Sequence, residues 1–257
     1  MRQLLPRKTV AEIVVAPSLR FYDEMVSIGE HLLEKMGTTD WQRRALSLEI
    51  QDRVKLQRVN LEYNRFFFEF DSEPDSCDSL VHNVDAYLVD TMVKFNMIDF
   101  QHVGFRQWWA IEIDGNDEKK LISKMSQHFL QLGHIEELST QFQFEDAAQT
   151  LEFRDQNDPG KTCRIITGAM ERDQWALHVP YATPDRGGTH LLSNGFETIK
   201  DSLPSDFVFV DVDFRLRCNG ADKEVVCEFF KSAATRSEAT AKTMLQKIRA
   251  INLEPEN

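Results

Sequence analysis

The segment DFVFVDVDFRLR, residues 206–217, constrains the fold of this chain more than any other segment. Its apolar and polar residues alternate without a gap, and a period of two is typical of a β-strand that buries one face. The face predicted to be buried consists of Val208, Val210, Val212, Phe214 and Leu216. Such a strand needs a sheet that packs against other elements on one side, and antiparallel sheets commonly have that form.

The segment FQHVGFRQWWAIEIDG, residues 100–115, predicts a second long strand with two different faces. The core face would hold Val103, Phe105, Gln107, Trp109, Ile111 and Ile113. The other face would hold His102, Gly104, Arg106, Trp108, Glu112 and Asp114. Two explanations of that other face remain open. Either Trp108 stacks on a ligand in a groove where Arg106 binds a carboxylate or phosphate, or Arg106 pairs with an acidic residue across the sheet and a helix covers Trp108.

Strand and helix patterns alternate along the rest of the chain. The other predicted strands cover residues 9–16, 46–50, 54–63, 65–70, 140–153, 161–169 and 174–179. The predicted helices cover residues 19–36, 78–95, 117–132 and 222–250. This order predicts an α+β fold with two β-α-β(3–4)-α repeats, whose antiparallel sheets are covered by helices on one face. The first repeat would be residues 1–97 and the second residues 98–257, packed as one compact unit.

The formal net charge of the chain is −12. This charge argues against a broad nucleic-acid-binding surface, because such a surface neutralises phosphates with Lys and Arg. It suits a protein whose partners are proteins or small molecules. No apolar run approaches the roughly 18 residues that a membrane span requires, so we expect no part in a membrane.

Cysteine usage predicts a cytoplasmic protein with reduced thiols. The four cysteines are Cys77, Cys163, Cys218 and Cys227, and none forms a CxxC pair, so the usual zinc spacing is absent. The sequence also contains neither GxGxxG nor GxxxxGK[ST], which are the phosphate-binding motifs of dinucleotide and P-loop sites. We therefore expect no bound cofactor.

Asp211 and Asp213 are the candidates for metal or acid–base chemistry. They share one face of the strand at 206–217, with Cα atoms roughly 6.5 Å apart, and with a third carboxylate they could hold a divalent metal ion. They could also serve as a catalytic acid and base. However, Arg215 and Arg217 follow on the same face, and charge pairs across the sheet would explain all four residues without chemistry.

The loop TPDRGGTH, residues 183–190, is the candidate binding site outside the strands. Its two glycines permit unusual backbone angles, and Arg186 and His190 could bind an anion. A surface loop without a function would have the same composition.

The block MIDFQHVGFRQW resembles the central motif of a sporadically distributed family of uncharacterised bacterial proteins of about this length. The late strand of that family is similar to the run from Val210 to Phe214, and its opening is similar to AEIVVAP. The final helix departs from the family pattern, because it has no histidine between Lys223 and Ala250. The order of elements also resembles the TATA-binding-protein-like fold. The family's patchy distribution implies a partner protein or regulator in mobile elements or defence loci.

Three functions therefore remain open. The first is a non-enzymatic binding protein that acts with a protein partner, as a subunit of a bacterial defence or toxin–antitoxin-type system. The second is a metal-dependent enzyme that acts on nucleotides or nucleic acid through Asp211 and Asp213. The third is a sensor of a small ligand, built around Trp108 and Arg106. We favour the first, because the sequence contains no recognisable catalytic motif.

Overall fold

The computed structural model describes residues 4–43, 47–70, 77–112, 148–171, 203, 206–218, 220 and 222–253. The strands are β1 (Leu4–Val15), β2 (Asp40–Arg43), β3 (Ser47–Asp52), β4 (Gln57–Glu62), β5 (Arg65–Phe70), β6 (Phe100–Glu112), β7 (Ala148–Arg154), β8 (Lys161–Glu171) and β9 (Asp206–Arg217). The helices are α1 (Arg20–Met36), α2 (Cys77–Val84), the π-helical turn η1 (Asp85–Val89), α3 (Asp90–Lys94) and α8 (Lys223–Leu253). The α+β class predicted from the sequence is confirmed.

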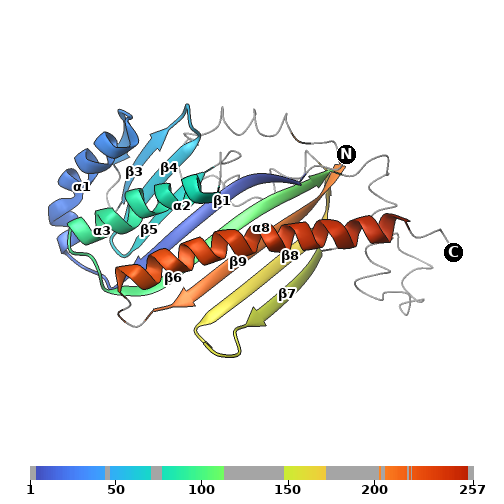
Figure 1. The fold of residues 1–257 in the computed structure, drawn as a ribbon. Coiled ribbons are helices and arrows are strands. Elements are labelled where there is room, and N and C mark those ends of the chain that lie inside the picture. Colours follow the sequence, from blue (N-terminus) through green and yellow to red (C-terminus); the bar gives the residue numbers. More distant parts are fainter. Residues whose placement is uncertain are drawn as a thin grey trace, which may run out of the picture.

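All nine described strands belong to one antiparallel sheet, in the order β2-β3-β4-β5-β1-β6-β9-β8-β7 (Figure 1). The prediction of more than one sheet is therefore wrong. β1 and β6 pair with each other at the centre, in a register that runs from Leu4 opposite Ile111 to Val15 opposite Phe100. Because this pair joins the two halves of the sequence edge to edge, their strands form a continuous surface.

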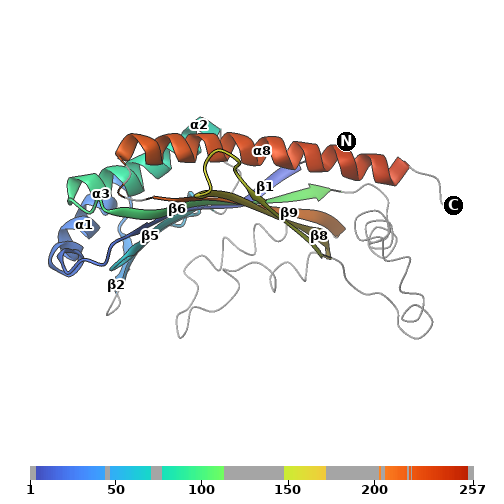
Figure 2. The same cartoon turned by 90° about the horizontal axis from the view of Figure 1, so that it is seen from below.

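The described helices lie on one face of the sheet, as expected (Figure 2). α1 ends at Gly37, whose φ of 67° lies in the left-handed region that glycine adopts without strain. The predicted helix at 78–95 is present as the run α2, η1 and α3. The predicted helix at 117–132 and strand at 174–179 lie outside the described residues.

The core lies between the sheet and these helices. Phe105 and Phe66 on the sheet are fully buried, together with Phe21 of α1. One apolar cluster gathers α1, α2, α3 and the first part of α8, and a second gathers β6, β8 and β9 under Ala241, Met244 and Leu245 of α8. α8 therefore covers both halves of the sheet. No helix in the described ranges is long and apolar enough to cross a membrane.

Candidate functional site

A row of ionisable side chains crosses the face of the sheet that points away from the described helices, here called the far face. The row consists of Glu49, Arg58, Glu69, Lys8, Arg106, Asp211, Asp213, Arg215 and Arg164, on strands β3, β4, β5, β1, β6, β9 and β8. Residues directly opposite each other in antiparallel strands point to the same face, and the register places all of these on the far face. The apolar residues that alternate with them point to the helix-covered face, so the positions on the far face are left to polar side chains.

Arg106 is held by Asp211 on the neighbouring strand. Arg106 Nε donates to Asp211 Oδ1 at 2.9 Å, and Nη2 donates to Oδ2 at 2.5 Å, which is a bidentate pair. Burial alone would lower the pKa of Arg106, but hydrogen bonding to Asp211 raises it above its ordinary value. Arg106 thus pairs with an acidic residue across the sheet, as the second explanation of this face expects.

Trp108 lies beneath two cations of the row. The guanidinium carbon of Arg106 is 4.5 Å from the centre of the Trp108 ring, and Lys8 Nζ is 5.8 Å from it. Such cation–π contacts contribute about 0.5–2 kcal/mol each, more where water is excluded. Trp108 is only 6% exposed, and the described helices lie on the opposite face, so the expected helical cover is not among them. The other tryptophan, Trp109, belongs to the core, as predicted.

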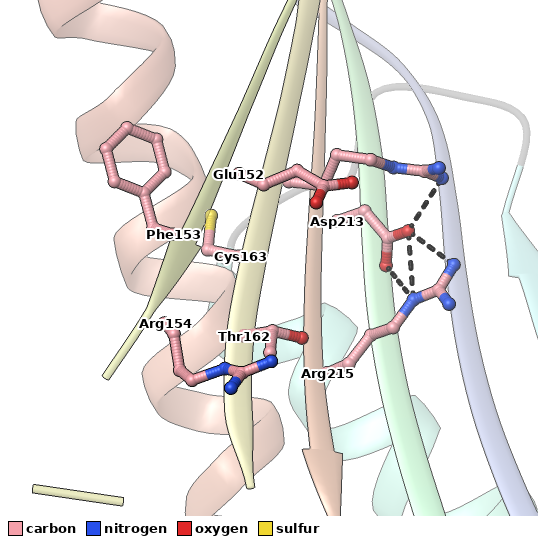
Figure 3. Close-up of a pocket in the computed structure, with 8 residues that line it drawn as sticks. Glu152, Phe153, Arg154, Thr162, Cys163, Asp213 and Arg215 are labelled. Atoms are coloured by element: carbon pink, nitrogen blue, oxygen red, sulfur yellow. Dashed lines mark hydrogen bonds and ion pairs between the residues drawn. The ribbon is translucent and has the colours of Figure 1, made fainter. Parts of the chain in front are cut away.

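Asp213 is shared by two arginines. Arg164, directly opposite on β8, donates from Nη2 to Asp213 Oδ2 at 3.1 Å, and Arg215 donates from Nη2 to the same oxygen at 2.7 Å (Figure 3). The hydrogen bond to Asp213 raises the pKa of Arg215. The Asp213 side chain is 5% exposed, whereas those of Arg164 and Arg215 are 36% and 49% exposed. The carboxylate is therefore enclosed while both cations still reach solvent.

An open pocket of about 330 Å³ lies beside this cluster, over the ends of β7, β8 and β9. Its lining residues are Glu152, Phe153, Arg154, Thr162, Cys163, Arg164, Asp213 and Arg215 (Figure 3). Three arginines and two carboxylates give the lining a formal charge of +1. This local excess of positive charge contrasts with the net charge of −12 of the whole chain.

The other end of the row is more deeply buried, and it was not predicted from the sequence. Lys8, 1% exposed, lies 3.3 Å from Glu69, and Arg58 forms a hydrogen-bonded ion pair with the same carboxylate. Burial alone would raise the pKa of Glu69, but Lys8 and Arg58 together lower it. The sequence does indicate that Arg58 and Glu69 lie on a polar strand face, because each alternates with apolar residues. Their pairing could not be predicted without the strand order.

Other potential reactive groups near the row show no activation. Burial raises the pKa of the Cys163 thiol to about 11, so it is protonated at neutral pH and a poor nucleophile. Burial lowers the pKa of His102, so its imidazole is neutral at pH 7. Within the described ranges, no three His, Cys, Asp or Glu side chains come together in an arrangement that could hold a metal ion.

The structure brings together two groups of residues that the sequence presented separately. His102, Arg106 and Trp108 on β6 lie on the same face as Asp211 and Asp213 on β9. The remaining predicted binding residues, Arg186 and His190, lie outside the described residues. A comparison with known protein families found no family model that matches the chain, and a comparison with curated proteins found no match either.

Proposed function

We propose that this chain is a non-enzymatic binding protein that acts with a protein partner and receives an acidic group of that partner in the arginine-lined pocket. The observation that carries the proposal is the sharing of Asp213 by Arg164 and Arg215. A guanidinium group has five N–H donors, so both arginines retain donors after Asp213 has accepted its bonds. A carboxylate is the planar acceptor that such donors fit best.

The charge of the whole chain favours a small acidic group over a polyanion. A nucleic acid brings many phosphates close to the surface, and a chain of net charge −12 repels them beyond the few arginines of the pocket. A single acidic side chain or a C-terminal carboxylate meets mainly the local charge, since salt screens interactions beyond about 8–10 Å. The proposed ligand is therefore an acidic segment of a protein.

Asp211 and Asp213 contribute to this function as partners of arginine. A divalent metal ion bound at these carboxylates would have to displace Arg106 from Asp211, and Arg164 and Arg215 from Asp213. Displacement of Arg106, whose side chain is 27% exposed, would leave a largely buried guanidinium group without its acceptor, which is costly. This cost favours the binding protein over the metal-dependent enzyme.

We further propose that the chain consists of two β-α-β(3–4)-α repeats, whose strands join in one sheet. The strands β2-β3-β4-β5-β1 lie on one side of the centre, and β6-β9-β8-β7 continue on the other side in the corresponding reversed order. This order supports the resemblance to the TATA-binding-protein-like fold, but a shared fold does not give a function. The resemblance to the sporadically distributed bacterial family points to a subunit of a defence or toxin–antitoxin-type system. Products of neighbouring genes are therefore the first partners to examine.

Binding of a defined acidic probe tests the proposed site. With a fluorescently labelled oligoglutamate peptide, we expect Arg215→Gln to weaken binding roughly 10–100-fold, because it removes a charge-assisted hydrogen-bond donor. Asp213→Asn should instead strengthen binding, because the carboxylate that competes for Arg164 and Arg215 is neutralised. Fluorescence anisotropy at low salt measures both changes.

The matched control is Lys231→Gln, which removes an exposed positive charge from α8 at a residue that does not line the pocket. It should bind the peptide as the wild type does. Equal weakening of peptide binding by Lys231→Gln and Arg215→Gln would show that only the net charge of the protein matters. It would contradict binding in the pocket. Binding of Mn²⁺ that is lost in Asp213→Asn would favour the metal-dependent enzyme instead. A pull-down of candidate partners should show the same dependence on Arg215.

A further inference from the structure

Among the described strands, β7 has no neighbour on its outer edge. It ends their order in the sheet, and Thr150, Glu152, Phe153 and Arg154 are all exposed, with Phe153 52% exposed. It contains no lysine or proline, which natural sheets use to block such edges. We infer that β7 pairs with β7 of a second copy of this chain, in an antiparallel register centred on Phe153.

The hydrogen-bonding direction of β7 fixes which registers are allowed. The N–H of Asp155 donates to the carbonyl of Lys161 at 3.0 Å, so residues of odd number near this end direct their backbone groups toward β8. Glu152 and Arg154 therefore direct theirs toward the open edge. In a symmetric antiparallel pair, these outward groups face each other only when even-numbered residues lie opposite even-numbered residues, so the two-fold axis passes through a residue and not between two residues. A centre on Glu152 or on Arg154 would place two like charges opposite each other, which disfavours it.

The centre at Phe153 makes the edge self-complementary. Glu152 of each copy lies opposite Arg154 of the other in a hydrogen-bonded pair, so the two-fold symmetry creates two opposite-charge contacts. Phe153 lies opposite its own copy at the non-hydrogen-bonded position, where side chains approach most closely. A centre at Leu151 would instead place Glu152 opposite Thr150 and Arg154 opposite Ala148, and Phe153 opposite Gln149. The second copy is thus the partner that the charges of this edge fit.

The side chains of β7 are arranged for such a contact on both faces. Figure 3 shows Glu152 and Phe153 leaving β7 on opposite sides. The charged contacts therefore lie on the far face, and the pair of Phe153 rings lies on the helix-covered face. Pairing joins two sheets into one, with the two arginine-lined pockets on the same surface. It uses Glu152, Phe153 and Arg154 of the pocket lining but not Arg164 or Arg215, the two arginines that share Asp213.

Charge reversal tests the register directly. Sedimentation velocity over a series of protein concentrations should show a monomer–dimer equilibrium for the wild type. Glu152→Arg and Arg154→Glu should each raise the dimer Kd at least roughly tenfold, because each places like charges opposite each other twice. A one-to-one mixture of the two variants should dimerise as the wild type does, because both contacts then pair opposite charges. The double variant with both substitutions should do so as well.

Two further variants distinguish pairing at the β7 edge from a general effect of changed charge. Glu152→Pro removes an N–H that points outward and leaves the bonds to β8 in place, so it should give a folded monomer. Lys231→Glu on α8 changes the net charge equally and should dimerise normally. A wild type that stays monomeric at every concentration overturns the inference. Dimerisation that neither Glu152→Arg nor Arg154→Glu weakens also overturns it. That result is expected if the two-fold axis passes through Leu151.

Discussion

Asp211 and Asp213 have the same chemistry and the same strand face, yet their surroundings give them different roles. Asp211 is enclosed with a single bidentate partner, Arg106, which itself covers Trp108. Asp213 is equally enclosed, but its two arginines reach solvent. Asp211 therefore belongs to the framework of the far face, and Asp213 holds in place two arginines that reach solvent beside the pocket.

Two histidines, His31 on α1 and His102 on β6, predict a pH dependence of stability. Burial lowers the pKa of both His31 and His102 below the value of 6.5. The nearby Lys94 lowers the pKa of His31 further, and its ammonium group lies 2.9 Å from His31 Nδ1, which therefore accepts. Below about pH 6.5 these two histidines bind more protons in the unfolded chain than in the folded one. The free energy of unfolding is therefore unaffected by them above that pH, and it decreases as the pH falls below it.

Urea unfolding at about pH 7.5 and pH 5.5 measures this loss. The double variant His31→Gln with His102→Gln should show a smaller difference between the two pH values than the wild type. His82, which is exposed on α2, is the matched control, and His82→Gln should leave the difference unchanged. An equal pH dependence in the wild type and the double variant would contradict the role of these two histidines.

At the scale of elements, local periodicity predicted most of what the structure describes. β9 has the predicted bounds, and α1 begins within a residue of them, because each has an apolar face with a clear period. β2 was missed, because its four residues are short and largely exposed and carry no such period. The single sheet was also missed. The pairing of β1 with β6 joins segments about 90 residues apart, and a local pattern says which face is buried but not which strand is adjacent.

The same limit applied to the candidate site. Strand alternation placed Arg106, Trp108, Asp211 and Asp213 on polar faces, and those faces are correct. The bond between Arg106 and Asp211 is diagonal, since the residue directly opposite Arg106 is Asp213. The choice of partner depends on side-chain geometry and on Arg164 from β8, and none of this is present in the sequence of β6 or β9 alone.

One buried hydrogen bond attaches α8 to the sheet. Trp109 Nε1–H on β6 donates to Ser237 Oγ at 3.1 Å, and both side chains are buried. Ser237→Ala should lower the free energy of unfolding by about 1–3 kcal/mol, because the indole N–H is left without an acceptor. Urea denaturation measures the change. Ser232→Ala, one and a half turns earlier and less buried, should cost much less, and equal losses would show only a general effect of serine removal.

At the scale of the whole molecule, α8 and the central strand pair make the two halves of the chain interdependent. Val226 and Phe230 of α8 complete the apolar cluster formed by α1, α2 and α3. Lys223 at the start of α8 also pairs with Asp90 of α3 at 2.7 Å. A large part of the core of the first half is therefore supplied by the second half.

Separate expression of residues 1–97 and 98–257 tests this interdependence. Neither half should show a cooperative thermal transition alone, because each would expose an edge of the central pair, and the first half would lack α8. Co-expression should recover a complex with the circular dichroism of the intact chain. An independently folded first half would show that each repeat is a domain, and would contradict the requirement for α8.

The central position of β6 also has a consequence during synthesis on the ribosome. One edge of β6 can pair with β1 at once, but its other partner, β9, is translated much later. At about 5–20 residues per second, the roughly 90 residues between them take on the order of 5–20 seconds to emerge. During that interval the nascent chain presents FQHVGFRQWWAI as an open edge, and Arg106 is the one arginine or lysine within it. The residue that neutralises Asp211 in the finished protein is thus also the one positive charge that opposes edge-to-edge pairing of this segment before β9 is made.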